Sequence, residues 1–431
     1  GCLNAATGNF TTLGGGQELS ATGSHATATG GCFNVARGAG GTVAGGISGH
    51  AGGACTFVGG GKGNRALADF DTVAGGNTNY AYSYYSFIGG GGCNCATGCT
   101  GVIAGGCCNT QEAEMGNIVG GFRNHICAAA SWSSMFIGAG RQNVISSCYY
   151  YNSIVGGLSN TMTQYASGAF IGGGECNQSN HHNTFVGGGY GLSATAPWAG
   201  VAAGKNNSSC GCFSFVGGGE GNTATGVCAT IAGGWCNTAC AIAGTVGGGY
   251  CNNACGICST IAGGTGNDIT SSGGNGFIGS GNGNQVTAGG GAIVGGESNK
   301  SKDCSAFVGA GSTNFACGTY SGIAAGSQNI TCQQGSFVGA GQLNCAHGEG
   351  SSVVAGYKNQ SLAENSFIGG GCENTVKSTH CHSTVLGTRM GTVSSNMVHI
   401  NSLFFLLSDL PTSNPGVPGV VWSNSCQLSV S

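Results

Sequence analysis

The sequence predicts an all-β protein, a parallel β-roll or β-solenoid of about 25 stacked fifteen-residue rungs. A fifteen-residue unit repeats along nearly the whole chain. The repeat is plainest at 215–267, which reads FVGGGEGNTATGVCA, TIAGGWCNTACAIAG, TVGGGYCNNACGICS and TIAGGTGN. Glycine supplies 92 of the 431 residues, whereas charged residues make up only 6%. A repeat this short is one coil of a stacked array, because it cannot bury a core of its own.

Composition excludes several other classes of protein. Glycine has no triplet period and proline occurs only four times, so the chain is not collagen. A hydrophobic content of 40% argues against disorder. The net charge of −3 predicts no general attraction to nucleic acid. Apolar runs such as 403–407 are far shorter than the roughly 18 residues of a membrane helix, so we expect no membrane insertion.

The rungs are counted from the first residue of each segment that resembles FVGGGEGN, here called the anchor. Most anchors lie fifteen residues apart, and the spacings of 19, 17 and 17 that lead to Phe136, Ser153 and Phe170 predict bulged corners. The 25 anchors are Thr12, Thr27, Thr42, Phe57, Thr72, Phe87, Val102, Asn117, Phe136, Ser153, Phe170, Phe185, Gly200, Phe215, Thr230, Thr245, Thr260, Phe277, Ala292, Phe307, Gly322, Phe337, Ser352, Phe367 and Thr384. Strands stacked about 4.8 Å apart would make a rod on the order of 120 Å long.

Each rung holds two short extended segments separated by glycine corners. In one rung these are Thr230-Ile231-Ala232 and Asn237-Thr238-Ala239, with Gly233-Gly234 between them. Short segments with β-branched residues between glycines lack the three-to-four-residue apolar spacing of a helix. We therefore predict two strands in each rung.

The anchors carry a second period. From Phe277 to Phe367 they alternate between phenylalanine and a small residue, which is how stacked layers fill space without voids. The residue after the anchor is nearly always Ile, Val or Ala, and it points to the opposite face of the strand. Both faces are therefore apolar. One face can line the interior, and the other needs a partner, so we infer a homo-oligomer, with a homotrimer as the preferred state.

Asparagine occupies the eighth position of the rung in 21 of 25 rungs, the exceptions being Leu19, Gly49, Leu192 and Gly391. Asparagine tolerates left-handed backbone at corners, and stacked amides can hydrogen-bond from rung to rung. The alternative is glycan attachment, since several asparagines lie in N-x-S/T triplets. These are Asn177, Asn206, Asn207, Asn299, Asn329 and Asn359.

The repeat ends near residue 396, which divides the chain into a solenoid rod (1–396) and a C-terminal segment (397–431). That segment contains Trp422 and three of the four prolines. An exposed solenoid end is an open sheet edge, so we predict that the segment caps or trimerises the rod. The chain begins at Gly1 rather than at methionine, so we expect that an N-terminal part preceded it.

Twenty-six cysteines in a weakly charged chain indicate an oxidising, extracellular destination. Some cysteines share one position in neighbouring rungs, at a spacing that suits a disulfide. The predicted disulfides are Cys93–Cys108, Cys236–Cys251, Cys240–Cys255 and Cys317–Cys332. The alternative is that these cysteines are unpaired and serve as small apolar residues.

No enzyme motif is present. Segments such as FVGGGKGN superficially suggest a phosphate loop, but they recur in nearly every rung and no helix follows them. The 14 acidic residues are so scattered that a carboxylate pair is expected only across subunits. We therefore predict that the protein is not an enzyme.

Two resemblances point to a class of protein. The segment NTATGVCATIAGG at 222–234 resembles the head repeats of trimeric bacterial autotransporter adhesins, which implies left-handed parallel β-rolls that associate as trimers. This chain departs from that family in its fifteen-residue rung and in the absence of a coiled-coil stalk and a membrane barrel. The tail LSDLPTSNPGVPGVVWSNSCQLSVS resembles the C-terminal segment of phage and other virus fibre proteins. The FIGGG repeats are similar to those of large DNA viruses and marine phages.

The resemblance to trimeric virus fibres also bears on His380-Cys381-His382. If this segment is an extended strand, both imidazoles lie on one face. Three copies around a threefold axis would then hold iron or another transition metal with His380 and His382, as such fibres do. The alternative is a surface corner.

The resemblances imply a structural virus or phage fibre at the virion surface, or more broadly outside the cell, that contributes to host attachment. Its expected partners are other copies of itself, a host receptor or glycan, and other virion proteins reached through a preceding N-terminal part or the C-terminal segment. The alternatives are a cellular trimeric adhesin or surface filament and, more remotely, an ice-binding solenoid, although phenylalanine interrupts the threonine array that ice binding needs. Exposed aromatic residues at the insertions are candidates for receptor contact, or else corner packing residues. They are Trp132, Tyr149, Tyr150, Tyr151 and Trp198.

Overall fold

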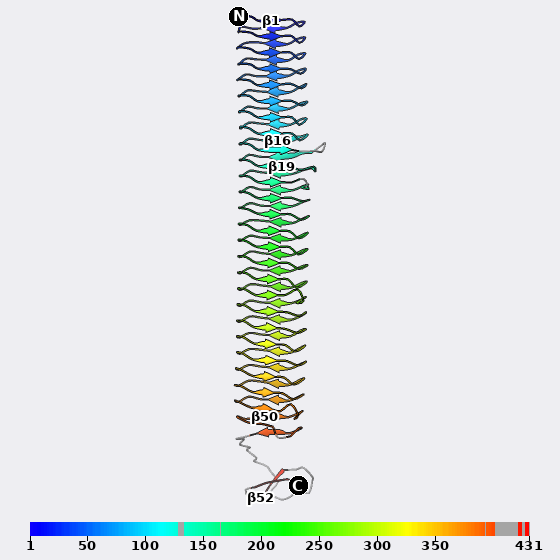
Figure 1. Cartoon of the computed structure of the whole chain (residues 1–431), viewed down its shortest axis with the longest axis vertical. Coiled ribbons are helices and arrows are strands. Elements are labelled where there is room, and N and C mark those ends of the chain that lie inside the picture. The colour runs from blue at the N-terminus through cyan, green and yellow to red at the C-terminus, as the bar shows by residue number, and fades with distance from the viewer. Residues whose placement is uncertain (128–132, 164, 393, 401–420, 425–426, 431) are drawn as a thin grey trace.

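The computed structural model shows one long, unbranched stack of short strands, with the N-terminus at one end and β50 (Thr384–Leu386) near the other (Figure 1). It describes residues 1–127, 133–163, 165–392, 394–400, 421–424 and 427–430, the last two by their backbone alone. Every regular element in these ranges is a strand. The all-β solenoid with fifteen-residue rungs is therefore confirmed. A search of the same ranges finds no helix long and apolar enough to cross a bilayer.

The even-numbered strands up to β50 form one parallel sheet, and each of these strands begins at an anchor or one residue before it. The sheet runs from β2 (Thr12–Leu13) to β50 and then to β51 (Val398–Ile400), and β16 (Gly116–Ile118) and β18 (Met135–Ile137) each hold three residues. The two-residue strands begin at residues 12, 27, 42, 57, 72, 87, 102, 153, 170, 185, 200, 215, 230, 245, 260, 277, 292, 307, 322, 337, 352 and 367.

The odd-numbered strands form the second parallel sheet, from β1 (Ala5–Ala6) to β49 (Thr375–Val376). In this sheet β17 (His125–Cys127) and β19 (Val144–Ser146) hold three residues. The two-residue strands begin at residues 5, 20, 35, 50, 65, 80, 95, 110, 161, 178, 193, 208, 223, 238, 253, 268, 285, 300, 315, 330, 345, 360 and 375. The two sheets therefore begin at positions 1 and 9 of the rung.

The stacking register follows the sequence period through the insertions. Asn117 pairs with Phe136, Phe136 with Ser153, and Ser153 with Phe170, so the extra residues leave the sheet intact. A third ladder of isolated bridges joins position 6 of each rung to its neighbours, as between Lys62 and Asn77. Every rung is thus hydrogen-bonded to the next along two sheets and a corner.

The core is a narrow layer between the two sheets. It consists of Val or Ile at position 2 and mostly Ala at position 10, as at Ile231 and Ala239, and both of these side chains are fully buried. Small alanines face the branched residues because the two sheets lie close together. The prediction that one apolar face of this strand lines the interior is confirmed, and the structure shows that it is the face of the residue after the anchor.

The eighth-position asparagines, here called the ladder asparagines, are buried and hydrogen-bonded on every side. The amide nitrogen of Asn64 donates to the carbonyls of Gly60 (2.6 Å) and Gly76 (2.9 Å). Its oxygen Oδ1 accepts the backbone N–H of the next ladder residue, Asn79, at 3.0 Å. The predicted hydrogen bonding from rung to rung is therefore confirmed, and it adds a second donor to the Gly76 carbonyl, which also accepts the backbone N–H of Lys62.

The expectation that these asparagines adopt left-handed backbone is wrong. Apart from glycines, the left-handed residues lie mostly at positions 7 and 14, for example Thr78 (φ 57°) and Phe70 (φ 64°), and the ladder asparagines are not among them. The corners turn at the residue before the asparagine, which leaves the asparagine extended and facing inward. Of the six asparagines in N-x-S/T triplets, five are buried ladder residues, and only Asn206 is exposed.

The anchors face outward, so the even-numbered sheet carries a line of aromatic rings, here called the phenylalanine row. Except for Phe170, each ring keeps 37–43% of its area exposed. Phe337 pairs with Gly322 and Ser352, so large residues lie beside small ones as predicted. The row consists of Phe57, Phe87, Phe136, Phe170, Phe185, Phe215, Phe277, Phe307, Phe337 and Phe367.

The C-terminal end adds one strand to the rod. β51 lies within the segment 397–431, and it pairs in parallel with β50, which extends the even-numbered sheet. Beyond it, β52 (Val421–Asn424) and β53 (Gln427–Val430) form a separate antiparallel pair. The rest of this segment, 401–420, lies outside the described residues.

Candidate functional site

Four of the five aromatic residues proposed for receptor contact lie on one edge of the rod. Tyr149, Tyr150 and Tyr151 precede β20 (Ser153–Ile154), and Trp198 occupies position 14 three rungs further on. All four side chains are exposed, with Tyr151 the most exposed at 71%. Trp132 lies outside the described residues.

Neighbouring rings extend this cluster along the edge. The ring of Tyr149 meets that of His182 edge-on at 5.1 Å, and the backbone N–H of Trp198 donates to the His182 carbonyl at 2.9 Å. Trp198 in turn stacks on Phe213, with centroids 5.9 Å apart. Sequence reasoning missed Phe213, although it shares position 14 with Trp198 and lies one rung away. These residues, Tyr149, Tyr150, Tyr151, His182, Trp198 and Phe213, are here called the aromatic edge.

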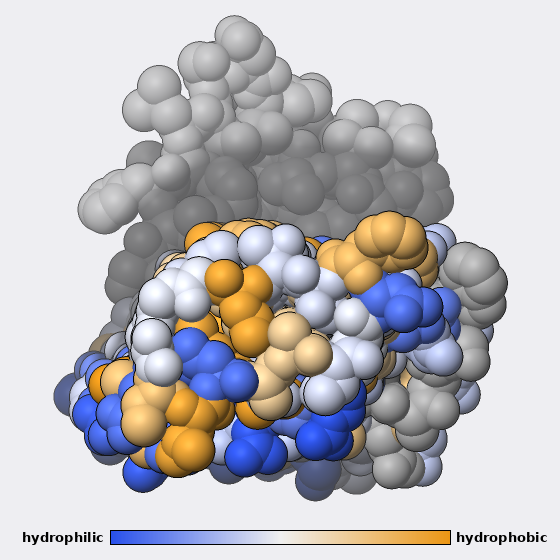
Figure 2. All heavy atoms as spheres, turned by 90° about the horizontal axis from the view of Figure 1, so that it is seen from above, coloured by the Kyte–Doolittle hydropathy of each residue, from blue (hydrophilic) through white to orange (hydrophobic). Residues whose placement is uncertain are grey.

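Seen along the long axis, hydrophobic and hydrophilic residues lie side by side around the outline of the rod (Figure 2). The low charge content therefore does not produce one uniform surface. The phenylalanine row and the aromatic edge are two groups of exposed apolar residues that extend along the rod.

One predicted cysteine pair is joined in the structure. Cys240 and Cys255 form a disulfide between position 11 of adjacent rungs, with Cα atoms 4.9 Å apart. This bond covalently links two rungs that the sheet already holds together.

The other three predicted pairs are free thiols in the structure, and their oxidation stays a prediction. Cys317 and Cys332 come close, with sulfur atoms 2.9 Å apart. Burial, together with the hydrogen bond from Cys317, raises the pKa of the Cys332 thiol to about 12. The remaining residues of these pairs are Cys93, Cys108, Cys236 and Cys251, all at the left-handed position 7.

The strand expected at His380 and His382 is absent. The segment forms a turn before β50, and His382 adopts left-handed backbone with φ 57°. His380 is held within the chain, because its Nδ1 shares a 2.8 Å hydrogen bond with Thr392 Oγ1. The two imidazoles therefore do not share a strand face, and this arrangement does not fit the predicted metal cage.

Two carboxylates lie close together within a single rung, which sequence reasoning did not expect. Asp69 Oδ1 accepts the N–H of Ala54 at 2.7 Å, and Asp71 accepts those of Ala68 (2.9 Å) and Ser86 (3.0 Å). Burial raises the pKa of Asp71 to about 6. Both carboxylates accept backbone N–H groups at the corners, so the two aspartates have a structural role.

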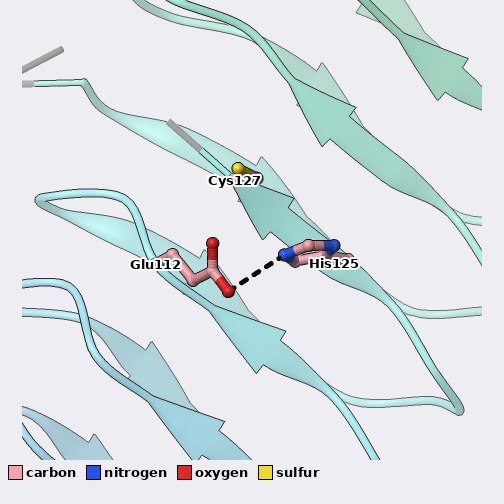
Figure 3. A group of neighbouring side chains, drawn as sticks. All are labelled: Glu112, His125 and Cys127. Carbon is pink, nitrogen blue, oxygen red and sulfur yellow. Dashed lines mark ion pairs between the residues drawn. The ribbon is translucent and has the colours of Figure 1, made fainter. Parts of the chain in front are cut away.

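Glu112, His125 and Cys127 form a cluster of three different ligand types (Figure 3). Their ligand atoms all lie within 4.8 Å of one another, and His125 Nε2 is 3.4 Å from Glu112 Oε1. Burial, followed by the hydrogen bond and charge of Glu112, raises the pKa of the Cys127 thiol. Sequence reasoning missed the cluster. The sequence pattern that could have revealed the cluster is an H-x-C pair with a glutamate fifteen residues before the cysteine.

The fold and these surfaces define the class as a cysteine-rich parallel β-solenoid. No family model matches the chain, and a search of curated proteins finds no relative. The resemblances to adhesin heads and to virus fibres, the left-handed coil and the trimer therefore stay predictions.

Proposed function

We propose that this chain is the rod of a structural, non-enzymatic virus or phage fibre that projects from the particle and contributes to host-surface attachment. The observation that carries the proposal is the unbroken even-numbered sheet, in which every strand pairs in parallel from β2 to β51. A rod on the order of 120 Å long results from this stacking. Such a chain suits the role of a stiff spacer, because each rung is hydrogen-bonded to its neighbours.

The phenylalanine row supports association of the rod with further copies of itself. The rings lie on the outer face of one sheet, at every second rung from Phe277 to Phe367, and all except Phe170 remain about two-fifths exposed. Exposed apolar groups that continue along a whole molecule indicate an interface. A second copy presents the same spacing, so we propose a homo-oligomer, preferably a trimer, joined along this row.

Replacing Phe307 and Phe337 by serine should weaken this association. Burying the exposed two-fifths of each ring contributes about 1 kcal/mol, so four rings across one two-chain contact contribute about 4 kcal/mol, roughly a thousandfold in affinity. Sedimentation across a concentration series measures the loss. The matched control is Phe315→Ser, which removes a ring from the odd-numbered sheet. Equal sedimentation of the double variant and the wild type would contradict the proposed interface.

The aromatic edge supports a role in attachment. Aromatic side chains provide large contact areas at low entropic cost, and they are enriched in binding hot spots. Tyr151, Trp198 and Phe213 are each more than half exposed. We propose that this edge contacts the host receptor or glycan.

Localisation tests the viral assignment. Antibodies raised against the purified rod should label projections on particles in electron micrographs of the source material. Labelling of a cell surface without particles would instead support the cellular adhesin or filament. Labelling confined to the cell interior would contradict both.

A further inference from the structure

The cluster of Glu112, His125 and Cys127 lies on the outer face of the odd-numbered sheet. Thr110 pairs with His125, and Gln111 pairs with Ile126, in the stacking of β15 (Thr110–Gln111) on β17. Gln111 and Ile126 are fully buried, so the alternate residues on either side of them face outward.

The sheet register explains why the three side chains meet. The backbone N–H of Glu112 donates to the carbonyl of Ile126 at 2.8 Å, which continues the ladder one residue beyond β15 and sets Glu112 beside Cys127. His125 and Cys127 are two residues apart on one strand and therefore share a face. Glu112 and His125 point toward one another in Figure 3.

One ligand atom in this cluster is buried without a hydrogen bond. His125 Nε2 is covered and has no hydrogen-bond partner among the described residues, although Glu112 Oε1 is 3.4 Å away. A buried polar nitrogen without a hydrogen bond is costly and calls for an explanation. A cation held between the carboxylate, the imidazole and the sulfur would satisfy it.

We propose that Glu112, His125 and Cys127 bind a divalent transition-metal ion of the zinc class. The donor set selects the ion, because thiolate and imidazole favour zinc and its neighbours over calcium and magnesium. Zinc is held by sulfur, nitrogen and carboxylate oxygen at about 2.0–2.3 Å, so ligand atoms already within 4.8 Å of one another need only small side-chain rotations. Three protein ligands leave one position for water.

The position of the site between two adjacent rungs indicates a structural role for the ion. Glu112 and Cys127 come from adjacent rungs, and the rung that holds His125 and Cys127 is the one with the 19-residue spacing between Asn117 and Phe136. The ion would tie two rungs together where the strict fifteen-residue period ends. Its binding also displaces the proton of the Cys127 thiol.

Titration with cobalt(II) alone, on the full chain under reducing conditions, tests the proposal. Cobalt(II) reports thiolate ligation through a charge-transfer absorption band. We expect Glu112→Gln, His125→Ala and Cys127→Ser each to weaken one binding equivalent at least tenfold. The matched control Cys210→Ser removes another outward thiol at position 11, where the residue at position 9 is Ser208 rather than histidine, and should leave that equivalent unchanged.

A structural readout accompanies the titration. Zinc should raise the melting temperature of the wild type and of Cys210→Ser, but not that of the three site variants. Circular dichroism of the metal-free proteins checks that all of them fold, as expected for substitutions on the outer face. Wild-type cobalt affinity in His125→Ala or Glu112→Gln would overturn the site, because the binding would then come from other thiols. An equal loss in Cys210→Ser would overturn it as well.

Discussion

Replacing Gly264 by alanine should destabilise the rod by about 3–5 kcal/mol, because the fifth position of the rung accepts no side chain. Gly264 has φ +98°, and a Cβ there would collide with the carbonyl oxygen of Gly281 in the next rung. A collision with backbone cannot be relieved by a rotamer change. Chemical denaturation measures the loss, and limited proteolysis should show new cleavage near the altered rung.

The neighbouring glycine provides the control. A Cβ at Gly263 meets nothing within 4 Å, and its backbone is not left-handed. Other rungs already carry alanine at this fourth position, as at Ala325 and Ala340. Gly263→Ala should therefore leave stability unchanged or raise it by up to about 1 kcal/mol. A similar loss in both variants would show that the collision with Gly281 is not the cause.

Replacing Asn207 by alanine should cost about 3–4 kcal/mol, because one side chain satisfies groups in two rungs. Its amide nitrogen donates to the carbonyls of Ala203 (2.9 Å) and Gly219 (2.8 Å). Its oxygen accepts the backbone N–H of Asn222 at 2.9 Å. Without it, that buried N–H has no acceptor. Thermal and denaturant unfolding measure the effect.

Asn206, the residue before Asn207, provides the control, because it is an asparagine that is not part of the ladder. Asn206 is exposed and left-handed with φ 54°, so Asn206→Gly removes no buried hydrogen bond and relieves a strained backbone. Its stability should stay within about 1 kcal/mol of the wild type. If Asn206→Gly lost as much as Asn207→Ala, the ladder would not be the source of the stability.

Some of the surface chemistry could be read from the repeat, and some could not. The four cysteine pairs follow from shared positions in adjacent rungs, and the structure joins Cys240 to Cys255. Glu112 and Cys127 likewise share position 11 in adjacent rungs, and His125 lies two residues before Cys127. This cluster went unrecognised because its members are of three different types and belong to no familiar motif.

The period, the two strands of each rung, an apolar strand face for the interior and the ladder of asparagines follow from the sequence alone. These features depend on local alternation and on identical units stacking in register, so they can be read without coordinates. Only the tertiary structure decided where the corners turn, as at Thr78 rather than at Asn79, and that His380 and His382 lie in a turn. It also decided which outward side chains meet. The physical reason is that backbone angles at corners and contacts between rungs depend on how each rung packs against its neighbours, and no single rung contains that information.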